Sequence, residues 1–294
     1  MSSLYLKHLM KKYHISNGYD VAKALYMSNP IFFLNYYNDQ KFSGGGRLDS
    51  EIYKFKNYTF IIYTDTRTKD IEFFIKVNND LDDPSNCMLL LLDRKNHMIN
   101  INSVSYNKGC AIEGLQRNHG GSIILNLVLE YINKIKDKYD IRYITLMDNS
   151  MKICEGKKIS LSIMYTLMHG ITWYGKYGFT PYDQFNDNAT KILKKKYENN
   201  MNIMKKTKLG DVPILKKYLL DAHKKIKPNV LFEDIMFVYE TMIKRGKLLL
   251  DFLRVFLKDF DNTCLMFNEF YYLLYDHLKL FDFHGKGFIK KLFT

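Results

Sequence analysis

Apolar and polar positions alternate with a period of two in the first half of the chain. Residues 58–64 and 71–77 are rich in β-branched and aromatic side chains, and the polar segment 64–70 between them fits a hairpin turn. The run 87–93 is almost continuously apolar, which indicates a buried central strand. Alternation resumes over residues 97–106. The pattern therefore predicts four successive strands.

The period then changes to that of a helix. Residues 122–136 place their apolar side chains on one stripe at helical spacing, namely Ile123, Ile124, Leu127, Val128, Tyr131, Ile132 and Ile135. Residues 142–147 predict another strand, and residues 151–158 predict a polar loop. A second helix is predicted over residues 159–169, with Gly170 at its C-cap position. Thr172 is placed to cap a short helical turn that begins at Trp173.

The two ends of the chain differ from this middle part. Residues 1–41 predict mostly helix, followed by a glycine-rich loop over residues 42–47. After Lys191 the strand signal fades, and four helices are predicted over residues 212–225, 230–245, 248–260 and 268–281. The order of elements predicts a mixed α/β (α+β) fold. We divide it into an N-terminal helical region with the glycine-rich loop (1–57), a core (58–190) and a mainly helical C-terminal extension (191–294).

Charge is distributed unevenly along the 294 residues. Residues 1–190 hold 23 Lys and Arg against 19 Asp and Glu, a net charge of +4. Residues 191–294 hold 21 against 12, a net charge of +9, so the extension carries most of the total of +13. A basic surface attracts anionic partners, including nucleotide cofactors, nucleic acid and anionic lipid. The densest run, Lys191–Lys196, is typical of a solvated helix face or a linker.

The cysteine spacing and the lack of a signal peptide or membrane-spanning segment indicate the cellular compartment. The four cysteines, at positions 87, 110, 154 and 264, show no C-x-x-C spacing, so the sequence predicts free thiols and no metal site. The N-terminus lacks the apolar run of a signal peptide, and no stretch is long enough to cross a bilayer. We expect a cytoplasmic protein in a reducing compartment.

A glycine-containing junction precedes the amphipathic helix. Backbone N–H groups at a helix N-terminus are unpaired, and the helix dipole adds partial positive charge, so such a junction can bind phosphate. Glycine allows the backbone to approach the ligand closely. The candidate binding residues are Arg117, Asn118, His119, Gly120, Gly121 and Ser122. The alternative interpretation is that the two glycines only form a tight turn.

The second motif places Tyr174 four residues before Gly178-Phe179. With the segment 117–122 and the helix after it, this spacing resembles the GNAT superfamily of acyl-CoA N-acyltransferases, over about residues 58–182. The resemblance implies a mixed twisted sheet flanked by helices and a pyrophosphate of acetyl-CoA held by residues 117–122. It also implies that Tyr174 protonates the departing thiolate, which a phenol of pKa near 10 can do. Trp173-Tyr174 and the helix before them are similar to GNAT-like proteins of large DNA viruses, which would place the chain in host cytoplasm or virion.

Other residues compete for these roles. Tyr174 can instead be an ordinary core aromatic, with Tyr177 as the functional phenol. Glu113 is our candidate for the general base that deprotonates the amine, with Glu72, Asp93 and His119 as alternatives by proximity. Two features depart from the family pattern: about twenty-five residues separate Asn149 from Tyr174, and no strand pair is predicted after Phe179.

The sequence thus supports three hypotheses. The first is an acetyl-CoA-dependent N-acetyltransferase that transfers an acetyl group to an amine of unknown identity by direct attack. The second is a catalytically inactive GNAT-like fold that serves as a structural or protein-interaction module, with the C-terminal helices as the contact surface. The third, a nucleic-acid-binding protein, rests on charge alone and has no motif.

Overall fold

A computed structural model describes residues 48–66, 71–76, 87–104, 120–226 and 232–292. Their fold is mixed α/β, with mostly antiparallel strands and seven α-helices in the described part. The chain divides after Arg142 into two compact units. The predicted N-terminal helices and glycine-rich loop, and the loop that leads to the amphipathic helix, lie outside the described residues.

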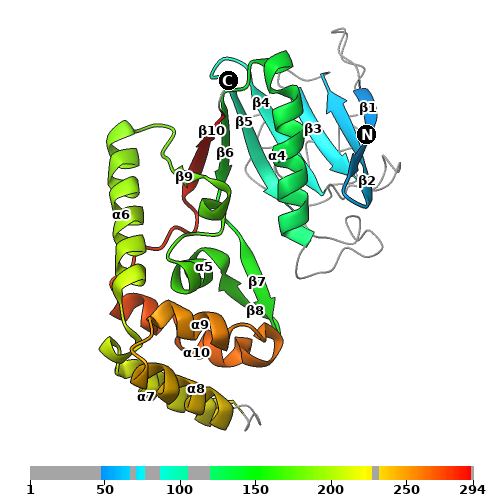
Figure 1. The fold of residues 1–294 in the computed structure, drawn as a ribbon. Helices are drawn as coiled ribbons and strands as arrows, with labels where there is room; N and C mark the ends of the chain where they lie inside the picture. The colour runs from blue at the N-terminus through cyan, green and yellow to red at the C-terminus, as the bar shows by residue number, and fades with distance from the viewer. Residues whose placement is uncertain (1–47, 67–70, 77–86, 105–119, 227–231, 293–294) are drawn as a thin grey trace, which may run out of the picture. The chain divides into compact units, whose positions relative to one another are not determined.

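The first unit contains a five-stranded antiparallel sheet in which each strand pairs with the next along the chain (Figure 1). Its strands are β1 (Leu48–Phe55), β2 (Tyr58–Asp65), β3 (Ile71–Lys76), β4 (Met88–Asp93) and β5 (Met98–Val104). Successive strands can pair in this way because the connections between β1 and β2 and between β4 and β5 are tight turns.

One helix, α4 (Gly120–Tyr139), lies across this sheet (Figure 1). Its apolar stripe is buried, with Ile124, Leu127 and Val128 fully inaccessible. Tyr131 meets the ring of Phe73 edge-on at 6.0 Å between centroids, and Tyr53 at 5.5 Å. Such edge-to-face pairs add to the energy of burial. The stripe that the sequence displays at helical spacing is therefore the face that packs on the sheet.

The second unit contains three strands that pair in antiparallel fashion. These are β6 (Tyr143–Met147), β9 (Thr180–Pro181) and β10 (Gly287–Lys291), and β10 lies between the other two. β10 is the last strand along the sequence, and about one hundred residues of helix and loop separate it from β9, with which it pairs. A separate hairpin consists of β7 (Met151–Cys154) and β8 (Lys157–Ser160).

Helices make up the rest of the second unit. They are α5 (Leu161–His169), α6 (Asp187–Lys206), α7 (Ile214–Lys225), α8 (Phe232–Lys244), α9 (Leu249–Phe256) and α10 (Phe260–His277), with 3-10 helices η2 (Tyr174–Tyr177) and η3 (Leu209–Asp211). Their buried side chains form one hydrophobic core, in which α10 contributes the largest aromatic cluster. Phe267, Phe270 and Tyr271 of this helix are almost fully buried. They pack as the core of the extension.

The structure confirms most elements predicted by periodicity and corrects others. The four strands, the helix over 122–136 and Gly170 as a left-handed C-cap (φ 73°) are present. The segment 151–158, predicted as a loop, instead lies in the β7–β8 hairpin. The sequence did not signal these strands because the segment holds few apolar residues. The strand β1 was not predicted. The last helix begins at Phe260, eight residues before its predicted start; Asp259 stands at its N-cap position, where the sequence indicated only a break.

The expectation of free thiols is wrong for the described cysteines. Cys154 and Cys264 form a disulfide that joins β7 to α10, and Cys87 is also disulfide-bonded. Their separation of 110 residues hides the pairing from the sequence. Packing of β7 against α10 brings the two Cα atoms to 5.9 Å, within the range that a disulfide requires.

Among the described residues, no helix is both long and apolar enough to cross a membrane.

Candidate functional site

The predicted site residues fall into three groups. Tyr174 opens η2 in the second unit. Gly120, Gly121 and Ser122 form the first turn of α4 in the first unit. The other predicted site residues, Glu113, Arg117, Asn118 and His119, lie outside the described residues.

The described part of the predicted phosphate-binding motif has features that favour an anion. α4 is 20 residues long, and its first turn carries no acidic side chain. Gly121 and Ser122 are half-buried, and Asn126 donates a hydrogen bond to the Ser122 carbonyl. A long helix that begins with glycines and without carboxylates presents its N–H groups and dipole to an anion. The residues present are compatible with a diphosphate.

Tyr174 lies in an aromatic cluster at the β9–β10 side of the second unit. Its side chain is 6% exposed and contacts the rings of Trp173, Phe179 and Phe288 at 4.8, 6.1 and 6.3 Å between centroids. Burial raises the pKa of the phenol, and the nearby charge of Asp148 raises it further. The phenol therefore keeps its proton throughout the physiological pH range.

Local sequence explains the position of η2. Thr172 Oγ1 accepts a hydrogen bond from the Gly175 amide at 3.2 Å, which confirms the predicted capping role. Lys290 Nζ on β10 donates to the Tyr177 carbonyl at 2.8 Å and ties the end of η2 to the sheet. Gly178 adopts φ 82° and ends the turn, a conformation that disfavours residues with a Cβ. The spacing from Tyr174 to Gly178 is thus the length of one closed turn.

The most unusual group near Tyr174 is Asp148, the residue that follows β6. Asp148 is fully buried, and its Oδ1 accepts hydrogen bonds from the Ser150 hydroxyl at 2.5 Å and the Ser150 amide at 3.2 Å. Its Oδ2 is buried and has no hydrogen-bond partner. Burial raises the pKa of this carboxyl above its usual value, against the lowering effect of the two Ser150 bonds. A buried carboxylate oxygen without a partner costs free energy and calls for a functional explanation.

His284 lies close enough to Asp148 for its charge to lower the pKa of that carboxyl, whereas the charge of Asp282 raises it. His284 is half-buried, and its Nδ1 is buried without a hydrogen-bond partner. Backbone bonds close this end of the β6–β10 pair, since Gly285 N donates to the Asp148 carbonyl at 2.7 Å and Asp148 N to the Lys286 carbonyl at 2.9 Å. The Asp148 carboxyl thus lies within electrostatic range of both the His284 imidazole and the Tyr174 phenol.

The loop that carries His284 is held by α6. Asn200 of α6 is buried; its Nδ2 donates to the Phe281 carbonyl at 2.8 Å, and its Oδ1 accepts from the Phe281 amide at 2.9 Å. Tyr275 also donates to that carbonyl at 2.5 Å. The two-way bond of one amide side chain to one backbone residue fixes the loop in a single position. We refer to Asp148, Tyr174 and His284 as the acid–base cluster.

Sequence reasoning missed two members of this cluster. Asp148 follows a strand in the segment Asp148-Asn149-Ser150, which indicated only the end of that strand, and His284 is separated from it by more than 130 residues. The side chain of Ser150 two residues after an aspartate was a weak signal for a capped turn. Nothing local indicated that the C-terminal strand would bring His284 to the end of β6.

The alternative general bases take other positions. Asp93 ends β4 and accepts hydrogen bonds from the Asn96 amide and side chain, which lowers its carboxyl pKa. It therefore shapes the turn between β4 and β5. Glu72 lies in β3 opposite Asp65 of β2. Within the part of the chain that the structure describes, no group of three or more His, Cys, Asp or Glu side chains could hold a metal ion.

Comparisons with known proteins gave no match for this chain. No family model matches it, and no curated protein and no solved structure matches it. The acid–base cluster and the described end of α4 are therefore the basis for any functional assignment.

Proposed function

We propose that the protein is an acetyl-CoA-dependent N-acetyltransferase of the GNAT type, which transfers an acetyl group to an amine. The observation that carries the proposal is the acid–base cluster, in which a buried carboxyl with an unpartnered oxygen lies beside a protonated phenol and an imidazole. Acyl transfer to an amine requires one group to give a proton and another to take one.

Each residue of the cluster has a role in this chemistry. Bound acetyl-CoA would supply an activated acetyl group as a thioester. His284 accepts the proton that the amine loses as its nitrogen bonds to the acetyl carbon. Tyr174 gives its proton to the departing sulfur. Asp148 stabilises the imidazolium, and the proton returns from His284 to the Tyr174 oxygen after transfer.

The strand arrangement of the second unit also supports the proposal. No strand pair was predicted after Phe179, yet β9 begins at Thr180 and pairs with β10. In this proposal, β9 and β10 correspond to the last strand pair that the resemblance implies, although they come from two distant parts of the chain. The segment 182–286 then forms an insertion between the two strands. The cytoplasmic location and the viral origin are also part of the proposal.

One observation favours the alternative, an inactive GNAT-like module. Three aromatic rings surround Tyr174 and leave it 6% exposed. Burial also raises the pKa of the phenol, which makes it a weaker acid than a phenol in water. If the phenol serves only in packing, the fold acts as a scaffold and the C-terminal helices are its contact surface.

Calorimetry with acetyl-CoA and a free-thiol assay with a panel of amines test the proposal. We expect acetyl-CoA to bind and thiol to be released in the presence of an amine. Tyr174→Phe should lower kcat by about 10²- to 10⁴-fold with little change in cofactor affinity, whereas the matched variant Tyr177→Phe should retain activity. Absence of both binding and thiol release would leave the inactive module as the function.

The general base is tested by the pH profile. His284→Gln should lower kcat/KM and change its pH profile because the proposed base is lost, and Asp148→Asn should do so because the imidazolium loses its stabilising charge. Unchanged profiles in both variants would return the role to Glu113 or another group.

A further inference from the structure

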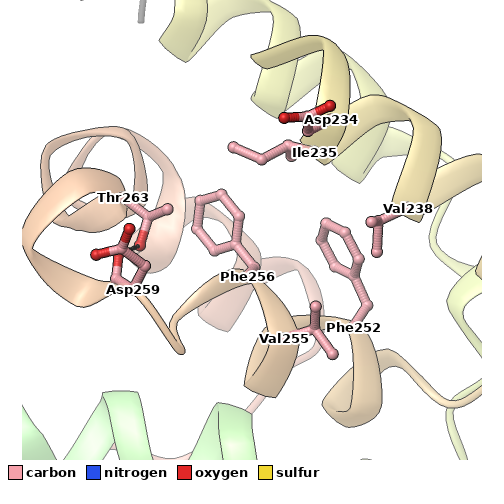
Figure 2. Close-up of a pocket in the computed structure, with 8 residues that line it drawn as sticks. All are labelled: Asp234, Ile235, Val238, Phe252, Val255, Phe256, Asp259 and Thr263. Carbon is pink, nitrogen blue, oxygen red and sulfur yellow. Dashed lines mark hydrogen bonds between the residues drawn. The ribbon is translucent and has the colours of Figure 1, made fainter. Parts of the chain in front are cut away.

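A pocket with an apolar floor lies between α8, α9 and the start of α10, all in the second unit (Figure 2). Phe252 and Phe256 form its floor and are 1% and 4% exposed. Ile235 and Val238 of α8 form the opposite wall and are half-buried. Its volume is about 160 Å³. The pocket is thus hydrophobic and partly open.

The rim of the pocket is acidic. Asp234 and Asp259 are exposed, and they are the charged side chains among the lining residues that the structure describes. In Figure 2 the two carboxylates stand on α8 and at the start of α10, on either side of the Phe256 ring. The surrounding segment 191–294 carries a net charge of +9, so an acidic rim contrasts with its setting. Charge complementarity favours a cationic partner at this rim.

The size of the pocket limits what can fill it. Pockets for cofactors and drug-sized molecules are usually about 300–1,000 Å³, which is larger than this one. A volume of about 160 Å³ fits one ring or one branched aliphatic side chain. Single apolar side chains that enter such pockets are the usual anchors of protein interfaces. The size therefore favours a side chain of another protein over a free ligand.

We propose that this pocket binds a segment of a partner protein that presents one large apolar side chain flanked by Lys or Arg. The apolar side chain packs on Phe252 and Phe256 and between Ile235 and Val238. The flanking cations pair with Asp234 and Asp259, and one of them can lie over the face of an aromatic ring. This proposal is independent of the acetyltransferase proposal, because it uses none of the residues of the acid–base cluster.

The probe is a short synthetic peptide with one phenylalanine between lysines, labelled for fluorescence anisotropy, with methyl NMR of Ile235 and Val238 as a second readout. We expect saturable binding that moves these methyl signals. Replacement of the phenylalanine by alanine should weaken binding on the order of tenfold, and glutamates in place of the lysines should weaken it further. Equal binding of all three peptides would overturn the proposal.

Variants of the protein locate the contact. Val255 lines the pocket and is 46% exposed, so Val255→Trp should fill the mouth without disturbing the core and should weaken binding at least tenfold, whereas Val255→Thr should retain it. Asp234→Asn with Asp259→Asn should weaken binding about fivefold and reduce its salt dependence, while Asp276→Asn, an exposed carboxylate on α10 outside the pocket, should not.

A second copy of the chain or a small molecule in the pocket would give different experimental results. If Val255→Trp instead converts a dimer to a monomer in sedimentation velocity, the occupant is a second copy of this chain and the proposal is wrong. It is also wrong if free benzylammonium binds as tightly as the peptide, because the pocket would then be a small-molecule site. A melting curve for each variant shows whether lost binding comes from unfolding.

Discussion

The two units differ in whether their buried polar side-chain atoms have hydrogen-bond partners. In the first unit Asp65 is buried at 4% exposure, yet it carries no unpartnered buried side-chain atom. In the second unit Asp148 is fully buried and one of its oxygens has no partner. All five such atoms among the described residues belong to the second unit. Two of the five, Asp148 Oδ2 and His284 Nδ1, belong to the acid–base cluster, and buried polar atoms without a partner call for a functional explanation.

The largest expected effect concerns the hydrophobic core of the first unit. Phe73 is fully buried between the sheet and α4, where it contacts Tyr131 and Tyr139 edge-on. Phe73→Ala should lower the free energy of unfolding by about 3–5 kcal/mol, because it leaves a cavity. Chemical denaturation measures this loss, and Phe185→Ala, at a side chain 88% exposed, should change it by less than about 0.5 kcal/mol. Similar losses in both variants would mean that Phe73 is not a core residue.

The second effect concerns the covalent link in the second unit. Because the Cys154–Cys264 disulfide closes a loop of 110 residues, Cys264→Ser should lower the free energy of unfolding by about 2–4 kcal/mol. The matched variants are Cys154→Ser and the double replacement, which should show the same loss as the single ones in denaturant titrations. Additive losses would show that the two sulfurs are not bonded to each other.

A smaller effect tests the close packing at the start of β10, near the acid–base cluster. A Cβ at Gly287 would lie 2.6 Å from the Tyr182 carbonyl oxygen, which is backbone and cannot move freely. Gly287→Ala should therefore destabilise the protein by about 1–3 kcal/mol. At Gly210 a Cβ meets nothing within 4 Å, so Gly210→Ala is the control and should be close to neutral in thermal unfolding. A neutral Gly287→Ala would contradict the described pairing of β9 and β10.

The smallest effect has the opposite sign. Burial raises the pKa of Asp148 in the folded protein, so the folded state binds this proton more tightly than the unfolded state. The contribution of Asp148 to the free energy of unfolding is therefore largest below its unfolded pKa and is lost as pH rises through its folded pKa. Asp148→Asn should remove this dependence and raise the free energy of unfolding at neutral pH by about 1–3 kcal/mol, while it impairs catalysis.

Urea titrations across acidic to neutral pH measure this effect, and Asp276→Asn at an exposed position is the control. If Asp148→Asn destabilises the protein at neutral pH, the carboxylate has a stabilising partner and the contrast between the two units disappears.

The sequence by itself determined the regular elements and much of the motif geometry. Period-two alternation located β2, β3 and β5, and a continuous apolar run located β4. The helical stripe of α4 predicted which face packs on the sheet, and Thr172 was predicted to cap the turn that holds Tyr174. These features could be predicted because burial acts on each element through the spacing of its own residues.

Only the tertiary structure decided which distant residues meet. The β10 strand returns from the end of the chain to lie between β6 and β9, and this brings His284 to Asp148. The same packing joins Cys154 to Cys264 and encloses the pocket at Phe252 and Phe256. Contacts of this kind leave no local pattern, because a side chain more than one hundred residues away contributes nothing to the periodicity of the segment it meets. The acid–base cluster is therefore a property of the fold, and Tyr174 alone was visible in the sequence.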